Sequence, residues 1–254
     1  DEQGFFIVEN ALSKSDIKTL REEFERIHAA EAGEGGHEVH VEPGARRISN
    51  IFNKTTAYDV CLNLGGIANL SYQKDGQRVA FDVCPFNIVF NHLAGKLGLP
   101  YDDGGKVSAG GMINAGLAHQ LSELSYYREN GPKSLGIEYI RAEVLPLIDQ
   151  AADTTENKLR TFCEHVVGQV AAALPAGSKS ILVTGGGGFH QFFISELEKQ
   201  PGVTGVHIPS PLIVNFKEAM IFAFLGVLRW RGEVNSLSSV TGARRNSSTG
   251  SIVL

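Results

Sequence analysis

The spacing of apolar residues changes near residue 60, and this change divides the chain into two unequal parts. Before it, a short apolar run at residues 5–8 precedes apolar residues that recur at helical spacing from Ile17 to Ile27. This spacing predicts an amphipathic helix, and the glycine-rich residues 31–44 predict a loop. We therefore expect a short, atypical α+β N-terminal segment over residues 1–60 and a larger domain over residues 61–254.

From Cys61 onward, runs of strand character alternate with runs of helical spacing, an order typical of an α/β fold. Two neighbouring strands are expected over residues 61–70 and 78–84, joined by a tight hairpin turn at Lys74-Asp75-Gly76. A short buried strand is expected over residues 181–183. The expected helices cover residues 87–97, 112–124, 156–174, 191–199 and 217–230.

Composition and charge narrow the class of protein. With 43% hydrophobic residues among 254, the chain can bury a sizeable core. The formal net charge is −5 and basic residues do not alternate with aromatic ones, so we expect no nucleic-acid partner. Three cysteines without CxxC spacing predict neither a disulfide framework nor a zinc ribbon, and they fit the cytoplasm. Without a long apolar stretch or a basic leader, the sequence predicts no contact with a membrane.

A run of four glycines, Gly185 to Gly188, lies between an apolar strand that ends near Val183 and a predicted helix. Glycines let the backbone approach a ligand closely, and the free N–H groups that begin the next helix attract an anion or a polar nucleotide edge. The run matches neither the P-loop pattern nor GxGxxG, and a simple sharp turn is the alternative. The context predicts a nucleotide-binding turn.

Two further features stand at predicted strand ends. Gly65 and Gly66 interrupt an apolar run that is flanked by Asn63 and Asn69, which indicates either a bulge or a close approach to a ligand. Asp82 places one carboxylate in an otherwise apolar strand end, and burial makes a carboxylate a better proton acceptor near neutral pH. The alternatives for Asp82 are a helix cap and a satisfied buried polar residue. We expect Asp82 and the glycine run to open onto one cleft.

Seven motifs occur in a fixed order along the larger domain. They are Asn63-Leu64-Gly65-Gly66-Ile67-Ala68-Asn69-Leu70, Phe81-Asp82 with Pro85 and Asn87, Tyr101-Asp102, Pro132-Lys133-Ser134 with Gly136 and Glu138, Gly185-Gly186-Gly187, Glu218-Ala219 with Phe222-Ala223, and Thr241-Gly242-Ala243. In this order the motifs resemble the anhydro-N-acetylmuramic acid kinase family. The resemblance implies an α/β fold of the actin, Hsp70 and sugar-kinase class, which is ribonuclease H-like. It also implies a reaction of peptidoglycan recycling, in which ATP and water convert the anhydro sugar to N-acetylmuramic acid 6-phosphate.

The resemblance also implies roles for individual residues. Asp82 matches the family's catalytic aspartate, which activates the attacking water, and Glu218 matches an acid close to the substrate. Gly65 and Gly66 match a phosphate-facing turn. The matching nucleotide-binding glycines are Gly185, Gly186, Gly187 and Gly188. The residues expected on the sugar side are Asn87, Lys133, Ser134 and Glu138. The implied cofactors are ATP and Mg²⁺ without a metal site made by the protein alone, and the resemblance suggests a homodimer.

The sequence also departs from the family pattern. Around the aspartate the family has Thr, Gly and Gly where this chain has Val83, Cys84 and Phe86. The family's Gly-Thr-Ser-x-Asp-Gly turn, which holds the ATP phosphates, does not occur before Cys61. The alternative interpretation is therefore a catalytically impaired or truncated nucleotide- or sugar-binding protein of the same fold.

Residues 5–50 resemble instead the beginning of phytanoyl-CoA dioxygenase-type proteins. An iron oxygenase of that kind needs two histidines and a carboxylate, usually with a His-x-Asp step, and none of the eight histidines is followed two places later by Asp. His37 and His40 are three residues apart rather than the four of a zinc protease, so we expect a solvated loop there. An iron- and oxoglutarate-dependent oxygenase is the third, weaker alternative.

Overall fold

The structure is a computed structural model that describes residues 58–75, 77–129, 133–177, 179–236 and 244–250. All of these described residues belong to one compact unit. The predicted N-terminal helix, the loop after it and the dioxygenase-like segment lie outside the described residues. The boundary at residue 60 therefore stays a prediction.

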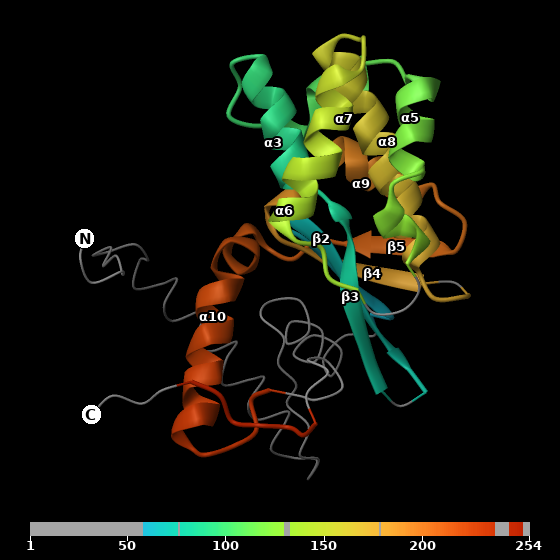
Figure 1. The fold of residues 1–254 in the computed structure, drawn as a ribbon. Coiled ribbons are helices and arrows are strands. Elements are labelled where there is room, and N and C mark those ends of the chain that lie inside the picture. Colours follow the sequence, from blue (N-terminus) through green and yellow to red (C-terminus); the bar gives the residue numbers. More distant parts are fainter. Residues whose placement is uncertain (1–57, 76, 130–132, 178, 237–243, 251–254) are drawn as a thin grey trace, which may run out of the picture. The chain divides into compact units, whose positions relative to one another are not determined.

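Five strands form one mixed sheet in the order β3-β2-β1-β4-β5 (Figure 1). They are β1 (Val60–Leu64), β2 (Ile67–Lys74), β3 (Gln77–Pro85), β4 (Lys179–Thr184) and β5 (Val203–His207). β2 is antiparallel to both β1 and β3, whereas β4 is parallel to both β1 and β5. This strand order, with one reversed strand among the described residues, is that of a ribonuclease H-like sheet. The predicted fold class is confirmed.

One prediction about the sheet was wrong. Residues 61–70 do not form one interrupted strand, because the chain reverses at Gly65-Gly66 and Leu64 pairs with Ala68 in an antiparallel hairpin. Two consecutive glycines make such a reversal inexpensive because they tolerate most backbone angles. The hairpin predicted after residue 73 is confirmed, since β2 and β3 pair up to Lys74 and Gln77.

Helices follow the strands along the chain largely as predicted. The longer ones are α3 (Asn87–Lys96), α5 (Ala115–Ser122), α7 (Leu145–Gln150), α8 (Thr155–Ala173), α9 (Gln191–Glu198) and α10 (Pro211–Trp230). Short turns are η1 (Asp103–Gly105), α4 (Lys106–Gly110), η2 (Ser125–Arg128), α6 (Ile137–Tyr139), η3 (Ile140–Val144) and η4 (Gly186–Phe189). The last helix begins earlier than predicted because Pro211 suits a first helical turn. The sequence predicted neither β5 nor the helical turns around residues 103–110 and 137–150.

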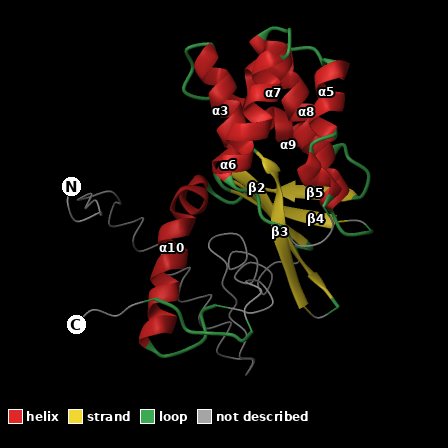
Figure 2. Cartoon of the chain, in the orientation of Figure 1, coloured by secondary structure: helices red, strands yellow, loops and turns green. Residues whose placement is uncertain are grey.

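The sheet packs differently on its two faces. Val60 and Leu62 are fully buried in a large cluster with residues of α3, α8 and α9, and Figure 2 shows these helices gathered on one side of the strands. Cys61 and Leu182 belong to a second cluster with Ile221 of α10. Because successive side chains of a strand point to opposite faces, α10 contacts the face that the other helices leave open.

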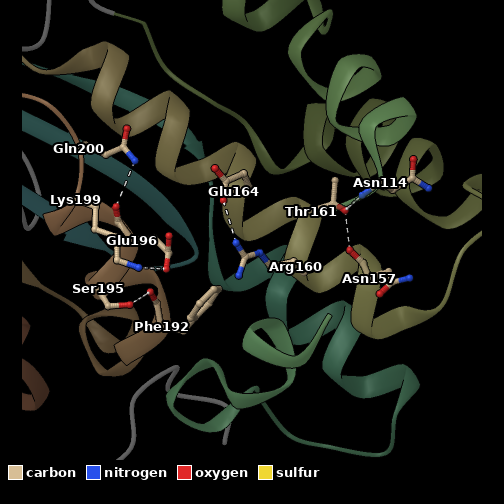
Figure 3. Close-up of polar contacts among 10 residues, drawn as sticks. All are labelled: Asn114, Asn157, Arg160, Thr161, Glu164, Phe192, Ser195, Glu196, Lys199 and Gln200. Atoms are coloured by element: carbon tan, nitrogen blue, oxygen red, sulfur yellow. Dashed lines mark hydrogen bonds and ion pairs between the residues drawn. The ribbon is translucent and has the colours of Figure 1, made fainter. Parts of the chain in front are cut away.

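Contacts between side chains join α8 to its neighbours, as Figure 3 shows. The Arg160 guanidinium lies 4.6 Å above the ring of Phe192 in α9 and 3.5 Å from the Glu164 carboxylate. On the other side of α8, the backbone N–H of Asn114 donates to Thr161 Oγ1 at 2.9 Å, which holds the beginning of α5. A cation–ring contact and a hydrogen bond thus connect α8 to α9 and to the beginning of α5.

Candidate active site

Four polar side chains form one row across the sheet. The strand pairing sets Asp82 of β3 opposite Asn69 of β2, Asn69 opposite Asn63 of β1, and Asn63 opposite Thr184 of β4. Directly opposite residues share a face, and this row lies where β1, β3 and β4 end. Ligands of open α/β sheets bind outside the carboxyl ends of the strands, so the row marks a candidate site. We call these four residues the polar row.

An irregularity in β3 places Asp82 in the row. Ala68 pairs with Cys84, but the next residue, Asn69, pairs with Asp82, so Val83 is an extra residue on β3. Such a bulge turns the following side chains to the other face of the strand. Without it, Asn69 would stand opposite Val83, and the carboxylate would point into the helical layer.

Three hydrogen bonds hold the Asp82 carboxylate. Oδ1 accepts from Asn69 Nδ2 at 3.1 Å, while Oδ2 accepts from the backbone N–H of Leu135 at 2.8 Å and from Ser134 Oγ at 3.3 Å. Asp82 is half-buried. Its backbone N–H also donates to the carbonyl of Lys133 at 3.0 Å, so residues 133–135 run along the free edge of β3.

Lys133 and Ser134 therefore point away from each other, although the sequence grouped them. The Lys133 ammonium donates to the carbonyl of Tyr126 at 2.6 Å and lies 4.2 Å from the centre of that ring. It lines a separate cleft of about 490 Å³, together with Tyr72, Phe81 and residues of α8. Burial lowers the pKa of Lys133 below its usual value, and nearby Glu129 opposes this. Of these two residues, Ser134 is the one whose side chain contacts the Asp82 carboxylate.

The glycine run forms a tight turn at the end of β4. Gly185 has a φ of +86°, and a Cβ at this position would lie 2.6 Å from the carbonyl oxygen of Leu64. A Cβ on Gly187 would lie 2.4 Å from the ring of Phe86. Gly186 is different, because the nearest atom to its Cβ would be Asn87 Nδ2 at 3.9 Å. Gly185 and Gly187 thus allow the turn to pack closely against Leu64 and Phe86, whereas Gly186 faces open space.

Gly186 opens onto a cleft of about 690 Å³ between the glycine turn, α3 and the η1 turn. Its lining includes Asn87, Asp102, Gly187 and Asn215 of α10. Asp82 is not among the described residues that line this cleft. It is connected to the glycine turn through the hydrogen-bonded polar row, because that row ends at Thr184, the residue before Gly185. One cleft shared by both features stays a prediction.

The first glycine pair holds the beginning of α3. The carbonyl of Gly65 accepts from the backbone N–H of Asn87 at 3.2 Å, and that of Gly66 accepts from Phe86 at 2.9 Å. The Asn87 side chain in turn donates to the carbonyl of Leu64 at 3.3 Å. The turn thereby fixes Asn87 at the rim of the cleft, and a phosphate-facing role for Gly65 and Gly66 stays a prediction.

A buried acid and a histidine form one wall of the cleft. Asp102 accepts hydrogen bonds from Val107 and Ser108, and its Oδ2 lies 3.8 Å from Nε2 of His190. The backbone N–H of Phe193 donates to His190 Nδ1 at 3.1 Å, so the neutral ring carries its proton on Nε2. Burial lowers the pKa of His190, and the Asp102 charge opposes this.

For two further predicted residues the structure describes no contact with this arrangement. Glu138 is exposed in α6, and within the described part of the chain no hydrogen bond connects it to the polar row. Glu218 lies in α10, but its side chain is outside what the structure describes.

No site role was predicted for Asn63, Asn69, Thr184 or Lys217. Lys217 of α10 is 5% exposed, and its ammonium donates to Asn63 Oδ1. The two asparagines flank the Gly65-Gly66 pair in the sequence, and this symmetry about a hairpin turn was the signal that could have found them. Nothing in the sequence signalled that Lys217 contacts β1.

A comparison with family models decides the family. The model described as anhydro-N-acetylmuramic acid kinase matches residues 23–254. This chain belongs to the anhydro-N-acetylmuramic acid kinase family. The match begins inside the segment that the sequence analysis separated from the kinase-like part.

Curated anhydro-N-acetylmuramic acid kinases agree with this assignment. The one from Vibrio cholerae serotype O1 is 32% identical over 259 residues, covering 94% of this chain and 66% of that protein. The one from Gloeobacter violaceus is 31% identical over 205 residues, covering 74% of this chain and 53% of that protein. The one from Streptomyces coelicolor is 34% identical over 201 residues, covering 75% and 51%. The chain thus spans about half to two thirds of the length of these family members.

Among solved structures, component A of the (R)-2-hydroxyglutaryl-CoA dehydratase of Acidaminococcus fermentans is similar with a TM-score of 0.40 and 14% identity, covering 68% of this chain and 61% of that one. A likeness this low supports no conclusion. The fold of this family member rests on its own strand order.

Proposed function

We propose that this chain supplies the nucleotide-binding and catalytic part of a kinase that phosphorylates anhydro-N-acetylmuramic acid with ATP. Water attacks the anomeric carbon, the bond from that carbon to the bridging oxygen breaks, and the freed oxygen takes the γ-phosphoryl group. The product is N-acetylmuramic acid 6-phosphate, an intermediate of peptidoglycan recycling. Family membership supports the reaction, and the setting of Asp82 supports the residue that carries it.

Asp82 has room for the proton that the attacking water must lose. An ionised carboxylate offers about four acceptor positions, two on each oxygen. The described residues occupy two on Oδ2, through Leu135 and Ser134, and one on Oδ1, through Asn69. The remaining position lies on Oδ1 of a half-buried group at the carboxyl edge of the sheet. A general base needs such a fixed oxygen within hydrogen-bond reach of water. This is the observation that carries the proposal.

The glycine turn and its cleft suit the nucleotide. Gly186 lets the backbone approach the ligand, because its open side leaves space that a side chain would fill, while Gly185 and Gly187 let the turn pack tightly against Leu64 and Phe86. Asn87 stands at the rim. We place ATP against this turn and against Gly65 and Gly66, with the sugar beside Asp82 and Ser134. Glu138, Lys133 and Glu218 stay in the proposal only as family-matched residues.

Mg²⁺ fits as a partner of the ATP phosphates. Among the described residues, no three His, Cys, Asp or Glu side chains group as metal ligands. Magnesium commonly uses one or two carboxylates together with substrate phosphates and water, so it needs no such group. Bound there, it would neutralise phosphate charge.

We further propose the cytoplasm as the location and a homodimer as the assembly. Cys61, Cys84 and Cys163 are all buried, and Cys84 and Cys163 are free thiols, as in a reducing compartment. In the part of the chain that the structure describes, no single helix is long and apolar enough to span a membrane. Two segments of α10, residues 211–217 and 221–230, are long and apolar enough only when taken together, and the helix is bent between them.

A coupled assay of ADP release tests the proposal on the 254-residue chain, with the anhydro sugar as substrate. We expect turnover that Asp82→Asn lowers at least about a hundredfold, the usual contribution of a general base. Asp149→Asn is the matched control, because Asp149 pairs with His92 and Lys96 on the surface. ATP binding by calorimetry without turnover would instead identify a catalytically impaired binding protein. Neither binding nor turnover would reject both interpretations.

A further inference from the structure

The amide groups of the polar row can point only one way. Asp82 Oδ1 accepts hydrogen bonds, so Asn69 must turn its Nδ2 toward it, at 3.1 Å. Asn69 Oδ1 is then left to accept from Asn63 Nδ2 at 3.0 Å. Asn63 Oδ1 in turn faces β4 and α10, where it needs donors. The orientation of each amide is therefore set by its neighbour, in a chain that ends at the carboxylate.

The donors at the far end of this chain are Thr184 and Lys217. Thr184 Oγ1 lies 3.3 Å from Asn63 Oδ1, and the Lys217 ammonium donates to the same oxygen. Lys217 is 5% exposed, and burying an ammonium is unfavourable unless strong acceptors surround it. A hydroxyl can both donate and accept, whereas an ammonium only donates. At this end of the chain, Lys217 thus forbids the flipped orientation of the Asn63 amide, as Asp82 does through Asn69 at the other end.

We infer that Lys217 is a positioning residue that, through Asn63 and Asn69, holds Oδ1 of Asp82 in place for proton transfer. The inference rests on the proposed function, since it names the oxygen that takes the proton and the side chains that fix it. Oδ2 is held by residues 134 and 135 whatever α10 does. Oδ1 depends on the chain of amides, and that chain begins on α10. The position of this helix would therefore govern the catalytic oxygen.

Three variants test the inference in the ADP-release assay. Lys217→Met removes the charge and keeps most of the volume, so kcat should fall about tenfold or more, because a misplacement of a catalytic group by 1 Å can cost about a hundredfold. KM for both substrates should stay near the wild-type value. Lys217→Arg, which still donates, should restore most of kcat. Lys199→Met is the control, because Lys199 pairs with Glu196 at the surface, as Figure 3 shows.

A double-mutant cycle separates this relay from a direct contact with substrate. In the background of Asn69→Leu, where the chain of amides is already interrupted, Lys217→Met should cause no further loss of kcat. If the two losses multiply, or if Lys217→Met raises KM with kcat unchanged, Lys217 acts on the ligand itself and the inference is wrong.

A measurement without substrate keeps this inference separate from the kinase proposal. Side-chain amide resonances of Asn63 and Asn69 can be followed by NMR in the wild-type chain and in both lysine variants. Lys217→Met should shift the signals of both asparagines, and Lys199→Met should leave them unchanged. Unchanged Asn69 signals in folded Lys217→Met would overturn the relay even if turnover is present. A wild-type chain without turnover would overturn the kinase proposal and leave this test intact.

Discussion

Asp82 and Asp102 are carboxylates with the same number of hydrogen bonds and different origins for them. Each accepts three from described residues. The donors to Asp102 are Val107 and Ser108, five and six residues further along the chain. The donors to Asp82 come from β2 and from residues 134–135, which are 13 to 53 residues away. The donors to Asp102 therefore come from its own turn, whereas the donors to Asp82 are brought to it by the sheet and the segment beside it.

Exposure separates the two carboxylates further. Asp102 is 5% exposed, and its nearest additional polar neighbour is the buried ring of His190. Asp82 is half-buried at the edge where the strands end. A carboxylate that is almost fully buried and held by its own turn stabilises the fold, and one held by distant elements at a sheet edge can meet a ligand. Hydrogen-bond number alone does not distinguish a structural acid from a catalytic one.

The largest expected effect on stability is that of Gly185→Ala, which disturbs the surroundings of Asp82 and spares those of Asp102. The new Cβ would lie 2.6 Å from the Leu64 carbonyl, at a φ of +86°. We expect a loss of about 3 kcal/mol in the free energy of unfolding, from overpacking and backbone strain together. Urea denaturation measures it.

Gly168→Ala is the control, since a Cβ there meets nothing within 4 Å on α8 and should stabilise the protein slightly. Equal effects of the two substitutions would show that the turn at Gly185 is not constrained.

Asp102→Asn should reduce stability less than Gly185→Ala does, and it tests the structural role of Asp102 against the catalytic role of Asp82. An amide has one accepting oxygen, so one of the donors on Val107 and Ser108 would face an NH₂ group. We expect the free energy of unfolding to fall by about 2 kcal/mol, because a buried donor loses its partner. Turnover per folded molecule should persist, in contrast to Asp82→Asn. A stable but inactive Asp102→Asn variant would reverse the roles given to the two acids.

The smallest expected effect is on the pH dependence of stability. Burial holds the pKa of His190 below its usual value, with the Asp102 charge opposing the shift. Below about pH 6.5, His190 therefore binds a proton readily in the unfolded chain but resists protonation in the folded protein. This contribution to stability is present above that pH and is lost as pH falls below it.

Urea midpoints measured between neutral and mildly acidic pH test this. His190→Asn, which keeps an acceptor for the N–H of Phe193, should flatten the dependence. Asp102→Asn should steepen it, because the ring loses its neighbouring charge. A dependence unaffected by either substitution would show that His190 is not the responsible group.

Much of the fold was predictable because its signals are local. Helical spacing located α3, α5, α8, α9 and α10 to within a few residues, apart from the early beginning of α10 at Pro211. The glycine run between β4 and α9 indicated a tight turn, which the positive φ of Gly185 requires. The error at residues 61–70 arose because two glycines permit a bulge and a reversal equally well. β5 escaped notice since Val203–His207 is short and only partly buried.

The sequence by itself determined the α/β class, the family and the presence of an acid at the end of β3. Tertiary structure alone decided which side chains meet that acid. The extra residue Val83 turns Asp82 toward Asn69, strand pairing places Asn63 and Thr184 beyond it, and α10 brings Lys217 to the end of the row. A local turn such as the one closed by Asp102 depends on a few neighbouring torsions, which local residue types control. A row across four strands depends on pairing registers between segments more than 100 residues apart, which no local pattern records.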